Sequence, residues 1–179
     1  MELARAVQLI EHPFLNSKNT VSYWADLGAG AGTFTLALAE LLPNGSLIYA
    51  VDRDRNALAK IPVKHKEVNI QKEVQNFQEF HIASKLDGLL MANSLHYIQD
   101  KRSFLKHLQA YLKLDHQLIL IEYDTRHGNP WVPYPIPFSD LESLFQELPY
   151  GKIEKIGSTH SIYSNGNIYA ALVQSIPVR

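Results

Sequence analysis

Three glycines at alternate positions, Gly28, Gly30 and Gly32, connect two segments that are rich in apolar residues. Residues 21–27 read as a strand, and residues 34–42 carry apolar side chains at the i, i+3, i+4 spacing of a helix face. A strand that enters a helix through a glycine-rich turn is typical of an α/β sheet, where ligands bind at the carboxyl ends of the strands. The glycines therefore predict both the fold class and the edge of the sheet that carries the site.

The rest of the chain continues this alternation. Further strands are predicted at residues 46–51, 68–71, 86–92, 118–123, 153–161 and 168–174. Helices are predicted at residues 54–61 and around the apolar positions of 104–112, and another opens at Ser139 with Glu142 as its capping-box partner. Such alternation predicts a mostly parallel sheet covered on both faces. The expected fold is an α/β three-layer sandwich with a seven-stranded sheet.

The last two predicted strands have no helix between them. Their short link contains Asn165-Gly166, and Asn-Gly is the strongest short hairpin signal because both central residues of that turn need a positive φ. The sheet is therefore expected to end in an antiparallel pair.

Composition narrows the class of protein. The 179 residues suit one domain, 1–179, with residues 1–20 as an N-terminal helix or short lid. The absence of cysteine excludes disulfides, thiolate metal sites and a cysteine nucleophile, and no histidine or carboxylate pattern predicts a metal. The net charge of −1 argues against nucleic acid as a partner.

The start of the chain and its apolar runs bear on location. No run approaches the roughly 20 apolar residues of a membrane span, and the first residues lack the pattern of a secretory signal. A cytoplasmic protein without a membrane partner is expected, and a homo-oligomer is left open.

The glycine spacing distinguishes this loop from two common nucleotide-binding loops. A dinucleotide loop, G-x-G-x-x-G, would need a small residue where Thr33 stands, and a P-loop would need a Gly-Lys-Ser/Thr ending. The pattern Asp26-x-Gly28-x-Gly30-x-Gly32 instead resembles the first motif of the class I S-adenosylmethionine-dependent methyltransferases. The predicted antiparallel end agrees with that family's sheet, in which the last strand lies between two others.

The resemblance implies S-adenosylmethionine as the cofactor. Asp26 is expected to organise the N–H groups of the loop and to attract the ammonium of the cofactor. Asp52, at the end of the next strand, is expected to accept both ribose hydroxyls, while Arg53 covers the adenine and Glu73 accepts its amino group. The predicted cofactor-binding residues are Asp26, Gly28, Ala29, Gly30, Gly32, Asp52, Arg53, Glu73, Val74, Asn93 and Ser94.

The segments that follow the fourth and fifth predicted strands are expected to face the methyl acceptor. The predicted substrate contacts are Tyr97, Tyr123, Trp131 and Tyr134. Methyl transfer needs a general base only when the nucleophile must lose a proton. His96 and His127 are then the catalytic candidates, because imidazole titrates near neutral pH.

Three functions are compared. The first is an enzyme that methylates an unidentified acceptor, with a small molecule favoured. The second is a catalytically silent partner or regulatory subunit that binds S-adenosylmethionine. The third, a nicotinamide-dependent oxidoreductase, is disfavoured by the glycine spacing and by the antiparallel end of the sheet.

Overall fold

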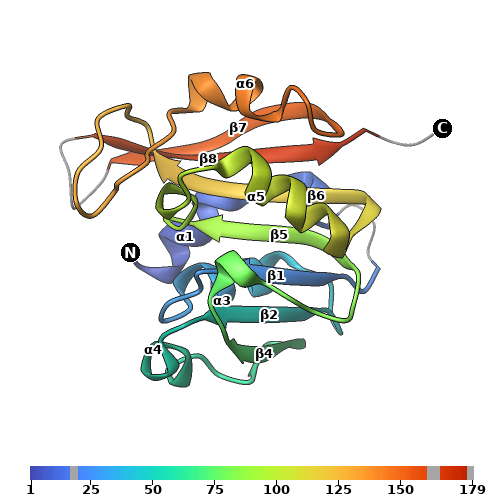
Figure 1. The fold of residues 1–179 in the computed structure, drawn as a ribbon. Coiled ribbons are helices and arrows are strands. Elements are labelled where there is room, and N and C mark those ends of the chain that lie inside the picture. The colour runs from blue at the N-terminus through green and yellow to red at the C-terminus, as the bar shows by residue number, and fades with distance from the viewer. Residues whose placement is uncertain (17–19, 161–165, 177–179) are drawn as a thin grey trace.

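An eight-stranded mixed sheet forms the centre of the structure, a computed structural model that describes residues 1–16, 20–160 and 166–176 (Figure 1). The strands are β1 Tyr23–Leu27, β2 Leu47–Asp52, β3 Lys64–His65, β4 Val68–Val74, β5 Leu86–Ala92, β6 Leu112–Tyr123, β7 Tyr150–His160 and β8 Asn167–Ser175. The helices are α1 Leu3–Ile10, α2 Pro13–Asn16, α3 Thr33–Leu41, α4 Arg55–Ala59, α5 Lys101–Leu108 and α6 Leu141–Phe145. Short 3-10 turns are η1 Phe77–Glu79, η2 Leu95–Tyr97, η3 Gln109–Tyr111 and η4 Phe138–Asp140.

The strand order is β3-β4-β2-β1-β5-β6-β8-β7. Strands β4, β2, β1, β5 and β6 are parallel, and β8 runs antiparallel between β6 and β7. The predicted parallel sheet with an antiparallel end is therefore confirmed, although Asn165 of the predicted turn lies outside the described residues. The extra strand, β3, has two residues and folds back on β4 through Lys66, whose φ is +49°.

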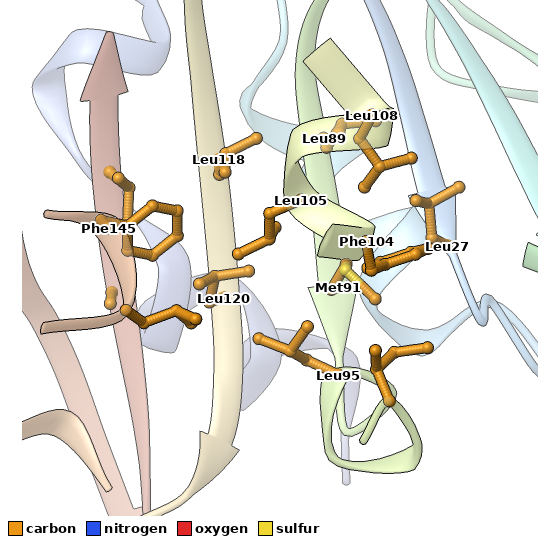
Figure 2. Close-up of a cluster of buried hydrophobic side chains, with 14 of the residues drawn as sticks. Leu27, Leu89, Met91, Leu95, Phe104, Leu105, Leu108, Leu118, Leu120 and Phe145 are labelled. Carbon is orange, nitrogen blue, oxygen red and sulfur yellow. The ribbon is translucent and has the colours of Figure 1, made fainter. Parts of the chain in front are cut away.

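Both faces of the sheet are buried, and successive residues of a strand serve opposite faces. In β6, Leu118 and Leu120 face the layer of α5 and α6, whereas Ile119 and Ile121 face the layer of α1 and α3. Figure 2 shows the first of these layers, where Phe104 and Leu105 of α5 pack over the sheet. This packing fixes the strand ends, and with them the loops that carry the site.

Helix α1 is part of a covering layer. Its Ala6, Leu9 and Ile10 are buried, and it packs on α3 and β7. A Cβ at Gly157 of β7 would lie 2.2 Å from the carbonyl oxygen of Leu9, so glycine allows the close approach. Helix α1 lies within residues 1–20, where a helix or short lid is expected, and its Arg5 borders one of the cavities described below.

The capping box predicted at Ser139 is wrong. Ser139 lies within η4, and α6 begins two residues later at Leu141 without a side-chain cap. The Ser139 hydroxyl accepts a hydrogen bond from Nη2 of Arg126 at 3.1 Å and donates to Asp140, so it does not cap a helix. By contrast, Asp54 caps α4 by accepting from the backbone N–H groups of residues 56 and 57.

Candidate functional site

Three cavities open near the carboxyl ends of the parallel strands, and Asn93 borders all of them. The glycine cavity, about 340 Å³, is lined by Gly28, Asp52, Arg53, Asn76, Phe77, Gln78, Asn93, Ser94 and Tyr97. The loop cavity, about 400 Å³, is lined by Asn93, His96, Tyr97, Tyr123, Thr125, Asn129, Trp131 and Val132. The N-terminal cavity, about 190 Å³, is lined by Met1, Arg5, Thr33, Phe34, Asn93, Tyr123, His160 and Ile168.

Asn93 combines two unusual features. Its φ is +53°, a left-handed conformation that few residues other than glycine adopt, and its backbone N–H donates to the carbonyl of Ile121 at 2.8 Å. Its side-chain Oδ1 is buried and has no hydrogen-bond partner among the described residues. A buried carbonyl oxygen without a donor is destabilising, so a ligand donor at the meeting point of the cavities would satisfy it.

The backbone of the glycine loop is held by β2. The N–H groups of Gly28 and Ala29 donate to the carbonyl of Val51 at 2.9 and 3.0 Å, and that of Gly30 donates to Oδ2 of Asp52 at 2.8 Å. Gly28 must lack a side chain because a Cβ there would lie 2.6 Å from the Cβ of Ser94. The loop is thus ordered by hydrogen bonds to the neighbouring strand.

Gly30 differs from the other two loop glycines. A Cβ at Gly32 would meet the side chain of Ile61 at 2.6 Å, whereas a Cβ at Gly30 would meet no described atom within 4 Å. Gly32 therefore serves the packing of α3 on the chain after α4, while Gly30 leaves open space beside the backbone. That space is what a ligand lying against the loop would need.

Asp26 does not organise the loop N–H groups, so this detail of the sequence prediction is wrong. The loop donors are taken by Val51 and Asp52, and Oδ2 of Asp26 instead accepts the hydroxyl of Thr35 at 2.6 Å. Oδ1 is buried without a partner in the described part of the chain. Burial raises the pKa of the Asp26 carboxyl to about 7, against the opposing hydrogen bond from Thr35.

Asp52 borders the glycine cavity, where the sequence places a ribose-binding carboxylate. Its Oδ2 accepts from Gly30 and its Oδ1 accepts from the backbone N–H of Asp54 at 2.9 Å. A carboxylate offers about four acceptor positions, so each oxygen can accept a further donor. Arg53 borders the same cavity.

Glu73 and Val74, the adenine contacts predicted after the third strand, are not among the residues that line the glycine cavity. Strand β4 runs to Val74, so Glu73 and Val74 lie within it, and Glu73 accepts from the side chain of Gln71 at 2.7 Å. The cavity is lined instead by the next turn, at Asn76, Phe77 and Gln78. The sequence prediction ends this strand three residues too early, because the consecutive polar residues Gln71, Lys72 and Glu73 interrupt its alternating pattern.

His96 and Glu122 form a buried pair at the wall of the loop cavity. Nδ1 of His96 lies 2.7 Å from Oε2 of Glu122, and the backbone N–H of His96 donates to Oε1 at 3.1 Å. The side chains are 2% and 1% exposed. A carboxylate that accepts this hydrogen bond takes it from Nδ1, and that arrangement leaves Nε2 as the acceptor on the ring.

Aromatic side chains supply much of the loop-cavity wall. The ring of Tyr97 lies 4.4 Å from that of His96, and the ring of Tyr123 lies 5.8 Å from it, centroid to centroid. Trp131 is 81% exposed on a turn that is closed by backbone hydrogen bonds between Asn129 and Val132. The wall of this cavity is therefore largely aromatic, with Trp131 on its solvent-exposed side.

Two of the predicted acceptor-side residues lie outside the cavity lining. His127 is exposed, and its backbone N–H donates to the Thr125 hydroxyl at 3.1 Å. Tyr134 contacts His96 through its backbone, because its N–H donates a hydrogen bond to the carbonyl of His96 at 3.0 Å. The structure thus brings His96, Tyr97, Tyr123 and Trp131 together at the loop cavity, whereas His127 and Tyr134 are not among its lining residues.

A buried lysine holds the loop after β6 against the site. Nζ of Lys101 donates to the carbonyl of Ile98 at 2.8 Å and to that of Tyr134 at 2.6 Å. Burial lowers the pKa of Lys101, and the negative charge of Glu122 acts in the opposite direction. Lys101 therefore connects the acceptor-side loop to the buried His96–Glu122 pair.

Several residues at the site were not identified from the sequence. Glu122 stands out in the sequence as an acid at the end of the apolar run of residues 118–121, but the sequence does not indicate that it pairs with His96. No sequence pattern indicates Arg5 or Thr33 as site residues, because they border the same cavity only when α1 packs beside α3. No group of metal-binding side chains and no helix long and apolar enough to span a bilayer occurs among residues 1–16, 20–160 and 166–176.

Comparison with known proteins gives a family and a fold. A family model described as a methyltransferase domain matches residues 25–115, about half of the chain. The release factor glutamine methyltransferase of Synechocystis is 43% identical over 49 residues, which are 27% of this chain and only 16% of that protein's length.

Solved structures extend the likeness to nearly the whole chain. An N-methyltransferase from Bradyrhizobium japonicum, in complex with S-adenosylhomocysteine, has a TM-score of 0.70 at 16% identity over 96% of this chain and 86% of its own. A magnesium protoporphyrin IX methyltransferase from Synechocystis, with bound S-adenosylmethionine, has a TM-score of 0.66 at 16% identity over 95% of this chain and 77% of its own. These similarities show a common fold.

Proposed function

We propose a function for this chain, which belongs to the methyltransferase domain family: it is an S-adenosylmethionine-dependent methyltransferase that methylates a small molecule bound in the loop cavity. The observation that carries this proposal is the position of Asn93. It joins three cavities and presents an unsatisfied buried oxygen where they meet.

The residues around Asn93 suit the three parts of the reaction complex. The glycine cavity, with open space at Gly30 and the carboxylate of Asp52, suits the adenosyl group. The N-terminal cavity offers Arg5 and Thr33 to a carboxylate, which suits the amino-acid tail. The loop cavity is then left for the acceptor.

S-adenosylmethionine supplies an electrophilic methyl group on a positively charged sulfur. The protein has to place the acceptor atom in line with it, and such alignment accounts for much of the rate gain in a displacement between two bound molecules. Asn93 and Tyr97, which border both the glycine and the loop cavity, are the residues in position to do this. His96 stands on the acceptor side as the proposed catalytic residue.

Calorimetric titration with S-adenosylhomocysteine tests the cofactor site. Gly30→Val should abolish binding because the side chain fills the open space beside the loop. Gly45→Ala is the matched control. Gly45 also has a positive φ, +85°, but lies in the turn that enters β2 at its other end. It should lose stability and keep affinity, and equal affinity in both variants would refute the site.

A silent S-adenosylmethionine-binding subunit is the second candidate. The buried His96–Glu122 pair favours the enzyme. It orients an imidazole at the wall of the loop cavity, and binding of S-adenosylmethionine alone does not require such a group. Affinity for S-adenosylhomocysteine without methyl transfer to any member of a broad acceptor panel would favour the silent subunit. The single domain and the cytoplasmic location stay predictions, which limited proteolysis and cell fractionation test.

A further inference from the structure

We propose that the methyl acceptor is a planar, uncharged aromatic compound bearing a hydroxyl group, and that His96 takes the proton of this hydroxyl. The inference rests on the proposed function and adds the chemical class of its substrate. It is carried by the walls of the loop cavity and by the geometry of the His96–Glu122 pair.

The walls of the loop cavity select for shape. Tyr97, Tyr123 and Trp131 present aromatic rings, and Val132 adds an aliphatic surface. Aromatic rings offer stacking or edge contacts to a planar ring system, and a volume of about 400 Å³ suits a small ligand. Thr125 and Asn129 give polar groups at the same wall for orientation.

The charges around the loop cavity select against ionic acceptors. Its described lining contains no Asp, Glu, Lys or Arg, so a carboxylate or an ammonium that the ligand places against this wall would lose water there without meeting an oppositely charged side chain. Lys101 does not fill this role, because its ammonium is held by the carbonyls of Ile98 and Tyr134. The cavity therefore favours a neutral ligand.

The His96–Glu122 pair selects for the reacting atom. The Glu122 carboxylate fixes the ring of His96 through Nδ1 and its backbone through N–H, so Nε2 is the basic atom at the cavity wall. A neutral amine attacks without first losing a proton, and a carboxylate has already lost it. A phenol-type hydroxyl is the acceptor that gains most from a neutral imidazole beside it.

The proton and electron balance of the step is simple. The hydroxyl proton passes to Nε2 of His96, the oxygen gives an electron pair to the methyl carbon, and the pair of the carbon–sulfur bond stays on sulfur. The products are a methyl ether, S-adenosylhomocysteine and one proton, which His96 later releases to solvent. Glu122 stabilises the imidazolium in between.

The groups that face this pair are few. Lys101 acts on Glu122 from α5, and the rings of Tyr97 and Tyr123 lie beside His96. Tyr169 of β8 donates its hydroxyl to the carbonyl of Ile136 at 2.9 Å, and burial together with the charge of Glu122 raises its pKa. Tyr169 therefore stays protonated and is no competing base.

The fluorescent phenol 7-hydroxycoumarin is a direct probe, because its neutral and anionic forms have separate excitation bands. It is titrated at pH 6.5 into protein saturated with S-adenosylhomocysteine, so that no turnover takes place. We expect saturable binding and at least a tenfold rise in the ratio of anion to neutral form over that of the free dye. His96→Gln should bind the dye within about threefold of the wild type and lose the rise.

The controls separate the possible failures. His107→Gln, an exposed histidine on α5 outside the three cavities, should behave as wild type. Failure to bind S-adenosylhomocysteine would overturn the proposed function itself. Binding of S-adenosylhomocysteine without binding of the dye, or an anion signal that persists in His96→Gln, would overturn only the acceptor class.

A competition among three related compounds completes the test. With S-adenosylmethionine present, 7-hydroxycoumarin should be methylated at least tenfold faster than 7-aminocoumarin or 7-hydroxycoumarin-3-carboxylate. Preference for the amine would indicate that no proton acceptor is needed. Preference for the carboxylate would indicate a cation in the acceptor site, and either result contradicts the inference.

Discussion

Glu122 holds His96 at two points, with its Oε2 2.7 Å from Nδ1 of the ring and its Oε1 3.1 Å from the backbone nitrogen. The two residues come from different segments, η2 after β5 and the end of β6, which are neighbours in the sheet. A single carboxylate thus sets both the tautomer and the position of the imidazole. This relationship gives the first prediction.

Glu122→Gln should keep the shape of the site but no longer fix the His96 ring in one tautomer. The amide can donate as well as accept, so nitrogen NMR of the ring should change from a proton fixed on Nδ1 to a mixture of tautomers. Methylation of 7-hydroxycoumarin should fall on the order of 10²-fold, at the lower end of general-base effects. Affinity for S-adenosylhomocysteine should be unchanged, and an unchanged ring spectrum would contradict the account.

Lys101→Met should loosen the loop after β6. The carbonyls of Ile98 and Tyr134 lose a charged donor, and leaving such buried acceptors unsatisfied costs about 1–3 kcal/mol. Urea unfolding should show this loss, and hydrogen exchange at the Tyr134 amide should become faster. Lys106→Met, an exposed lysine on the same helix, is the control and should change neither measurement.

Arg5→Ala should affect ligands that carry an amino-acid tail and spare those that lack one. The affinity for S-adenosylhomocysteine should fall about tenfold, the size of one charge-assisted hydrogen bond. Methylthioadenosine has the adenosine and sulfur but no such tail, so its affinity should not change. Equal losses for both ligands would contradict the assignment of the N-terminal cavity. Arg102→Ala, on α5, should leave both affinities unchanged.

Asp26 should make the ligand-free protein less stable as the pH rises. Its pKa is raised from 3.8 to about 7 by burial, so between these values the folded protein keeps a proton that the unfolded chain has lost. The free energy of unfolding should therefore fall as pH rises through this window, by on the order of 4 kcal/mol in total, and level off above pH 7.

Denaturant unfolding at a series of pH values measures the Asp26 effect. Asp26→Asn should remove this slope. Burial lowers the pKa of His116, so His116 makes the protein more stable as the pH rises below about pH 6.5. The difference between wild type and Asp26→Asn separates the Asp26 effect from this opposite contribution. Thr35→Val should move the midpoint to higher pH, because the Thr35 hydrogen bond lowers the pKa of Asp26. A wild-type slope in Asp26→Asn would contradict this account.

The sheet could be predicted because its central strands are continuous apolar runs. The sequence predicts residues 86–92, the observed bounds of β5, because both faces of that strand are buried and its apolar residues are interrupted only at Asp87 and Gly88. The sequence predicts too short a strand at β4. Gln71, Lys72 and Glu73 follow one another there, near an edge of the sheet where burial no longer selects apolar residues.

The site was predictable where it follows a single strand end and unpredictable where it depends on packing. Gly28, Asp52 and Asn93 follow or end their own strands, so sequence position placed them at the right edge. The pairing of Glu122 with His96 depends on β5 and β6 being neighbours, and the contribution of Arg5 depends on how α1 lies beside α3. Neither relation is local in the chain.

A crystal structure of the protein with S-adenosylhomocysteine tests the central claim most directly. We predict the adenosine in the glycine cavity beside Asp52, the amino-acid tail in the N-terminal cavity beside Arg5, and the sulfur next to Asn93, facing the loop cavity. A ligand bound elsewhere, or one whose sulfur lies away from Asn93 so that no acceptor in the loop cavity could reach it, would contradict the account.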